Sequence, residues 1–172
     1  MKYQDCAEAV QALDEEAQPL RLADANINPA TGLATDYLNH FNEAIMLLEM
    51  LSACPECLED FLGWRPKSYR EHFTASGFKA RDLAIAAYDA ADPNLRHCLD
   101  TLAGTMTAVL EATRAAMSAE MPAGTAATLA ERAAAWLRPL VARAGAVING
   151  ETDTGLDHPV APQAVVDGLM KR

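Results

Sequence analysis

The sequence predicts an all-α fold, and three observations support this prediction. Alanine and leucine number 35 and 20, whereas valine and isoleucine together number 11, so helix-favouring residues far outnumber the β-branched residues that favour strands. No segment alternates apolar and polar residues as a half-buried strand does. Apolar residues instead recur at helical spacing in several long segments of the 172-residue chain.

The first long helix is expected over residues 31–52. The residues before it, Asn28 to Gly32, are typical of a turn and a cap, because proline fixes φ and Asn or Thr can cap the amides that follow. At about 100° per residue, one face of this helix carries a stripe that we expect to face the core. The stripe consists of Leu33, Ala34, Tyr37, Phe41, Ala44, Leu48 and Leu51.

Three further long helices are expected over residues 67–91, 93–119 and 125–149. Asp92 and Pro93 form an N-cap followed by proline at the first helical position, which is a specific start signal. Pro139 should bend the last helix without ending it, because the apolar stripe stays in phase across it. The expected core residues of the three helices are Tyr69, Phe73, Ala80, Ala84, Ala87 and Ala91; Leu95, Leu99, Leu102, Met106, Val109, Leu110 and Thr113; and Leu129, Ala133, Trp136, Leu140, Ala144 and Val147.

Two kinds of residue are assigned to packing. Trp64 is expected to anchor a loop onto the core. The methionines are expected to fill gaps in the bundle, namely Met46, Met50, Met106, Met117 and Met121.

Four long helices joined by short loops predict a four-helix bundle. Short satellite helices are expected at residues 2–17 and 54–62. Because the chain has neither an internal repeat nor a low-complexity linker, we expect a single helical domain over residues 1–172. Within it, residues 1–28 form an acidic N-terminal helix and connector, and residues 150–172 form a C-terminal tail with a short docking helix.

The net charge of −10 lies wholly in the N-terminal third of the chain. Residues 1–63 hold two basic and twelve acidic residues, whereas residues 64–172 hold twelve of each. Because phosphate binding needs a basic footprint, we expect neither a nucleic acid nor a membrane surface as partner. The acidic residues 1–63 form either a solvated face with no binding role or a docking surface for a basic protein partner. The sequence leaves open whether the protein forms a homodimer.

We expect a cytoplasmic protein. No apolar stretch follows a basic N-terminal region, and no run approaches the roughly 18 apolar residues that a membrane helix needs. Four cysteines are too few for a disulfide scaffold in a chain of this length, which fits a reducing compartment. They are Cys6, Cys54, Cys57 and Cys98.

Two histidines and two carboxylates are the candidate metal ligands. On the helix predicted over residues 31–52, Asp36, His40 and Glu43 share one shoulder of the apolar stripe. His72 lies on the corresponding shoulder of the next helix, so the histidines converge if these helices pack side by side. Imidazole and carboxylate suit iron, manganese and zinc, although the usual bundle motif is Glu-x-x-His rather than the reverse. The alternative is two boundary histidines bonded to nearby carboxylates, with no cofactor.

The CxxC motif formed by Cys54 and Cys57 lies at the predicted start of a helix. Free backbone amides at such a position lower the pKa of a thiol, as a redox pair requires. Residues 43–57 resemble the all-α alkylhydroperoxidase-D-like redox proteins, which combine a CxxC with an upstream glutamate and a downstream histidine. Phe61 stands at the position of that histidine, so the resemblance implies a thiol pair without the family's proton relay.

Residues 33–40, which end at His40, together with the Leu-Glu-Met-Leu turn at residues 48–51, resemble the phosphoacceptor helix of histidine kinases and their bacterial phosphotransferase relatives. Thr35 occupies the phosphoacceptor position, so the resemblance leaves His40 as the residue to act instead. Simple phosphotransfer bundles place lysine and glycine three and four residues after their histidine. This chain has Glu43 and Ala44 there, and a glutamate so close repels a phosphoryl group.

The predicted function is therefore binding, in a regulatory or adaptor role, rather than catalysis. The sequence contains no glycine-rich phosphate loop, nucleophile elbow, zinc-protease motif or dinucleotide fingerprint. The alternative is a helical bundle with a metal or thiol redox site built from His40, Glu43, His72, Cys54 and Cys57. A histidine phosphotransfer-like bundle that uses His40 is the third hypothesis.

Overall fold

The computed structural model describes residues 18–118 and 121–151, and in these residues the all-α prediction is confirmed. Residues 18–24 are helical. An isolated bridge between Ile27 and Ala34 is the only β pairing in the described part of the chain. The elements that follow are η1 (Thr35–Leu38), α2 (Asn39–Met50), α3 (Cys57–Gly63), α4 (Tyr69–Ala75), α5 (Arg81–Ala90), α6 (Pro93–Met117) and α7 (Ala123–Ile148).

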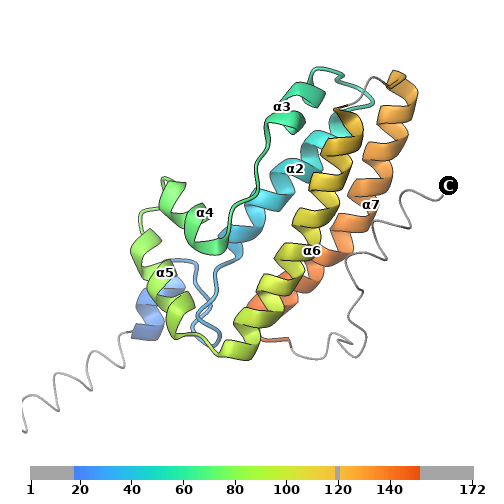
Figure 1. Cartoon of the computed structure of the whole chain (residues 1–172). Helices are drawn as coiled ribbons and strands as arrows, with labels where there is room; N and C mark the ends of the chain where they lie inside the picture. The colour runs from blue at the N-terminus through green and yellow to red at the C-terminus, as the bar shows by residue number, and fades with distance from the viewer. Residues whose placement is uncertain (1–17, 119–120, 152–172) are drawn as a thin grey trace, which may run out of the picture.

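The long helices α2, α6 and α7 form the body of the bundle (Figure 1). The helix α7 packs against both α2 and α6, while the short helix α3 contacts α2 and α6 at one end. Among the described helices none combines the length and the apolarity that crossing a membrane requires.

The prediction of one long helix over residues 67–91 is wrong, because the helix that starts at Tyr69 ends after about two turns, at Ala75. Ser76 leaves the helical conformation, with ψ at 156°, and Gly77 follows it. The Ser76 hydroxyl donates to the carbonyl of Phe73 and accepts from the amide of Phe78, at 2.9 and 3.3 Å, so it satisfies backbone groups that helix continuation would pair. The resulting helices α4 and α5, called here the α4–α5 lobe, stand beside the bundle (Figure 1).

Side-chain caps fix where two helices begin. Ser68 and Glu71 form a reciprocal capping box that starts α4. The predicted start at Asp92 is confirmed, since its Oδ1 accepts from the amides of Asn94 and Leu95 at 2.7 and 3.3 Å. Pro139 lies inside the continuous helix α7, as predicted.

The core agrees with the predicted stripe of the first long helix and corrects that of the last. All seven stripe residues between Leu33 and Leu51 are buried. Trp136 is 40% exposed, however, because α7 turns a mostly alanine face inward, including Ala130, Ala133 and Leu137. Small side chains there allow close approach to the neighbouring helices.

Met46 and Met50 are 50% and 44% exposed, so they do not fill the core as expected. They lie on the face of α2 opposite the buried stripe.

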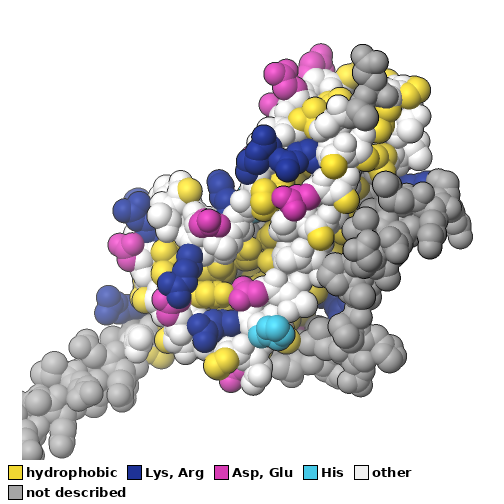
Figure 2. Space-filling view, viewed as in Figure 1, with side chains coloured by type: hydrophobic (Ala, Val, Ile, Leu, Met, Phe, Trp, Pro, Cys, Tyr) yellow, Lys and Arg dark blue, Asp and Glu magenta, His cyan; other side chains and the backbone are white. Residues whose placement is uncertain are grey.

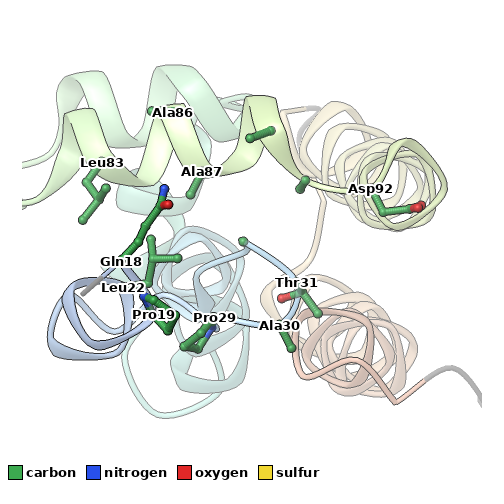
Figure 3. A pocket seen from close by; sticks show the side chains of 13 residues that line it. Gln18, Pro19, Leu22, Pro29, Ala30, Thr31, Leu83, Ala86, Ala87 and Asp92 are labelled. Atoms are coloured by element: carbon green, nitrogen blue, oxygen red, sulfur yellow. The ribbon is translucent and has the colours of Figure 1, made fainter. Parts of the chain in front are cut away.

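The loop before η1 packs closely against the α4–α5 lobe. Gly32 has φ of +71°, and a Cβ at this position would lie 2.8 Å from the carbonyl oxygen of Ala87 on α5. Only glycine suits both the positive φ and this approach. Beside the contact is a shallow hollow of about 360 Å³, bordered by Leu22 from the helical residues 18–24 and by Leu83 of α5 (Figure 3).

Two predicted segments lie outside the described residues. They are the satellite helix over residues 2–17 and the short docking helix in the tail after residue 151.

Candidate functional site

The structure brings His40 and His72 together, which the sequence leaves open because it depends on how their helices pack. His40 lies on α2 and His72 on α4, and the centroids of their rings are 6.0 Å apart. The break in the predicted helix over residues 67–91 does not disturb this pairing, because His72 precedes it.

Aromatic stacking and one hydrogen bond position His40. Its ring stacks on that of Trp64, with centroids 4.7 Å apart and planes 22° apart. The indole Nε1 of Trp64 donates to the backbone carbonyl of His40 at 3.2 Å, which fixes the loop after α3 against α2. Trp64 is buried, so its predicted anchoring role is confirmed.

The capping box of Ser68 positions His72 by starting α4 at a defined residue. The imidazole of His72 then meets the ring of Tyr37 edge-on, at 5.7 Å between centroids.

Burial makes both histidines weak bases. The His40 side chain is only 5% exposed, and its Nε2 is buried without a hydrogen-bond partner among the described residues. Desolvation, the charge of Lys67 and the neighbouring His72 lower the pKa of His40 from 6.5 to about 4. Desolvation and Lys67 also lower the pKa of His72, while the carboxylates of Asp36 and Glu43 oppose that shift. Both imidazoles are therefore neutral at pH 7.

A pocket of about 150 Å³ opens beside the two rings. It is bordered by Asn39, His40, Glu43, Lys67, His72, Ala75 and Ser76. Three of the four predicted metal ligands thus reach one pocket. The carboxylate of Asp36 is occupied elsewhere, since it accepts from the side-chain amides of Asn26 at 3.1 Å and Asn39 at 3.4 Å.

The described residues contain no group of three or more His, Cys, Asp or Glu side chains arranged to hold a metal ion. What they provide is a pair of neutral imidazoles with Glu43 at the rim. The metal site therefore stays a prediction.

Sequence reasoning missed the role of Lys67 at this site. It belongs to the connector between α3 and α4, and its charge acts on both histidines. Trp64 holds that connector on α2, and the hydroxyl of Tyr37 holds it through the carbonyl of Lys67. No local pattern encodes this contact.

The two cysteines of the CxxC motif are free thiols next to the start of α3. The Cys54 thiol donates to a carboxylate oxygen of Glu56 at 3.3 Å. Its hydrogen bonds with Cys57 and Glu56 raise the pKa of Cys54 to about 11. The expectation of a lowered thiol pKa is thus wrong for Cys54, because local hydrogen bonds to the protonated thiol outweigh the helix terminus.

The geometry also weighs against phosphotransfer through His40. A phosphoacceptor imidazole must be reached by another protein's phosphoryl group, whereas the His40 ring is buried under Trp64. Glu43 borders the same pocket and would repel that group.

A second feature is an exposed face of α2. Glu43, Met46, Glu49 and Met50, called here the α2 surface, are all exposed. Glu49 makes a two-point ion pair with the guanidinium of Arg138 on α7, and one of its hydrogen bonds measures 2.8 Å. The α2 surface therefore combines apolar side chains with carboxylates.

No family model, curated protein or solved structure matches this chain.

The lowered histidine pKa values predict a loss of stability in mild acid. Unfolded His40 takes up a proton near pH 6.5, but the folded protein resists protonation until about pH 4, so stability is complete above pH 6.5 and falls between these values. This shift corresponds to about 3 kcal/mol. His72 acts in the same direction. Urea unfolding from pH 4 to 7.5 with a chelator present measures the effect.

The variant His40→Phe keeps an aromatic ring on Trp64 but cannot titrate, so it should lose most of the acid sensitivity. His97→Gln, which changes an exposed histidine, serves as the matched control and should behave as the wild type. Equal pH dependence in all three proteins would show that His40 is not the sensitive group.

Proposed function

We propose that this protein acts by binding, as a small regulatory or adaptor protein that takes a basic, amphipathic segment of a partner protein on its α2 surface. The observation that carries the proposal is the pair of exposed methionines, Met46 and Met50, one helical turn apart between carboxylates.

Apolar exposure is concentrated on α2. Among the described residues the large hydrophobic side chains that are clearly exposed are Leu20, Met46, Met50 and Trp136. Two of the four share one face of one helix. Methionine is flexible and polarisable, which suits a surface that has to fit a partner's apolar side chains.

The surrounding charge selects a basic partner. Residues 18–63 contain one basic residue, Arg21, and seven acidic ones. Glu56, Glu59 and Asp60 of the α3 region are exposed, and acidic side chains gather over α3 in Figure 2. Because opposite potentials steer association and exclude wrong partners, lysine and arginine are the residues expected around the partner's apolar anchors.

A hollow next to the α2 surface offers room for one apolar anchor. It measures about 240 Å³ and lies where the turn after Met50 faces the start of α7. Leu51, Pro55 and Leu58 line one side of it, and alanines of α7 line the other. A helix that binds in a groove places its apolar side chains in hollows of this kind.

We also propose a cytoplasmic location. The support is that the three described cysteines, Cys54, Cys57 and Cys98, are free thiols, as in proteins of reducing compartments.

The partner proposal predicts binding of a lysine-rich amphipathic peptide of about 18 residues, measured by fluorescence anisotropy. Replacing Met46 and Met50 by serine should weaken binding at least about tenfold, because the apolar anchors lose their contacts. Added salt should weaken it further.

Trp136→Ala removes an exposed apolar side chain elsewhere on the bundle and is the matched control. The proposal fails if the two methionine replacements leave the affinity unchanged, since binding would then reflect net charge alone. It also fails if a glutamate-rich peptide of the same pattern binds equally well.

A second candidate function is metal binding by the histidine pair. The unpartnered Nε2 of His40 and the nearby ring of His72 favour it, because neutral imidazoles ligate zinc, iron and manganese without competition from protons. Glu43 is the third ligand of this hypothesis. The ammonium group of Lys67 opposes it by repelling a cation.

The metal hypothesis predicts that zinc raises the melting temperature of chelator-free protein, because a ligand that binds only the folded state stabilises it. The rise should vanish in His72→Gln and persist in His97→Gln. Elemental analysis of the purified protein provides an independent readout. A protein that contains no metal and shows the same melting temperature with zinc, iron or manganese would refute this function.

A further inference from the structure

Five residues of α7 form a basic and apolar face of that helix, called here the α7 stripe. They are Leu129, Arg132, Trp136, Leu140 and Arg143. At about 100° and 1.5 Å per residue they lie within about 80° of one another around the axis and extend over about 21 Å. The stripe is separate from the α2 surface, because Arg138, which pairs with that surface, lies on another side of α7.

Trp136 is the exposed apolar centre of the α7 stripe. Its side chain is 40% exposed, although an indole is among the side chains that gain most from leaving water. Leu140, one turn away, and Leu129, two turns away, are only partly covered by the core. Tryptophan and arginine are enriched among the residues that dominate binding at protein interfaces. The stripe therefore has the composition of a docking surface.

Both guanidinium groups of the stripe lack a carboxylate partner in the described part of the chain. Neither Arg132 nor Arg143 forms an ion pair there, whereas Arg138 of the same helix binds Glu49. The Nε of Arg143 is also buried without a hydrogen-bond acceptor among those residues. A buried donor without an acceptor is unfavourable, so this arrangement favours a carboxylate supplied by another molecule.

The carboxylates of α7 and α6 do not compensate the charge of the stripe. Glu131, the one acidic residue of α7, lies about 100° around the axis from the nearer arginine. On α6, Asp100 accepts the hydroxyl of Tyr88, and Glu111 lies 3.9 Å from Arg114. The stripe is thus a local positive patch on a chain whose net charge is −10, and it favours an acidic ligand.

We propose that the α7 stripe binds an acidic, amphipathic helical segment of a partner protein. Trp136 contacts the apolar face of that segment, and Arg132 and Arg143 each bind one of its carboxylates. The two arginines lie one turn and two turns from Trp136, which sets the spacing of the acidic residues around the segment's apolar anchor. This inference goes beyond the proposed function, since the surface and the charge of the partner both differ from those of the α2 surface.

The test uses the full chain and a helical peptide of about 18 residues, rich in leucine and glutamate and free of aromatic residues. Because Trp136 is exposed and Trp64 is buried, covering the stripe should shift the tryptophan emission of the protein to shorter wavelength. Titration of the peptide gives the dissociation constant, and added salt should weaken the binding. A lysine-rich peptide of the same pattern should leave the emission unchanged.

A double variant locates the site. Replacing Arg132 and Arg143 by glutamine should reduce the affinity for the acidic peptide at least about tenfold, because both carboxylate contacts are lost. The matched control replaces Arg21 and Arg81 by glutamine, which removes the same charge from exposed positions elsewhere and should have a much smaller effect. Circular dichroism confirms that both variants are folded.

The proposal is overturned if the acidic peptide causes no emission shift, or if the folded Arg132 and Arg143 variant binds it like the wild type. It is also overturned if replacing Met46 and Met50 by serine weakens this binding equally, because the peptide would then lie on the α2 surface. Sedimentation equilibrium that shows self-association lost in Trp136→Ser would assign the stripe to a second copy of this chain and overturn the proposal as well.

Discussion

The aromatic cluster that joins η1 and α2 to the α4–α5 lobe is the contact on which the histidine pocket depends, as does the cleft of about 520 Å³ between the lobe and α6. Tyr37 is its centre, since its ring meets those of Phe41, Tyr69 and His72 at 5.1 to 5.7 Å. Outside itself the lobe contacts η1 and the loop before η1, where Gly32 meets Ala87, so these rings and that loop hold it on the bundle. Hydrogen bonds from the hydroxyls fix the rings, including the one that Tyr69 accepts from the amide of Ala34 at 2.9 Å.

The same cluster gives the two sites different chemistry. Where rings bury imidazoles, desolvation keeps His40 and His72 neutral. Where the buried tyrosine rings border the cleft between the lobe and α6, the hydroxyls of Tyr37 and Tyr88 are held by the carbonyl of Lys67 and the carboxylate of Asp100. Lys67 borders both the pocket and the cleft, and its charge lowers the pKa of both histidines.

The sequence predicted those features that local chemistry decides. The start of α6 follows from Asp92 and Pro93. Helical phase placed His40 and His72 on matching shoulders of their helices, whereas their meeting depends on how those helices pack. The break after α4 was missed because it depends on the Ser76 hydroxyl, which bonds backbone groups of Phe73 and Phe78. The apolar stripe carries no information about these hydrogen bonds.

Properties that arise from tertiary contacts could not be predicted. The low pKa of His40 depends on the connector that carries Trp64 and Lys67, and the raised pKa of Cys54 depends on where Glu56 and Cys57 point. Met46 is exposed because no other helix covers that face of α2 among the described residues. The apolar pattern of a single helix does not tell which of its faces its neighbours cover. The cleft likewise exists only because α4 and α5 are separate helices.

Native-state hydrogen exchange of the wild type and of Tyr69→Leu tests most directly whether aromatic contacts hold the lobe on the bundle. If they do, the variant should raise the exchange rates of amides in α4 and α5 relative to those in α6 and α7 by at least about tenfold, because the lobe opens without the bundle. An equal acceleration in all four helices would contradict this account, since the lobe and the bundle would then unfold as one unit.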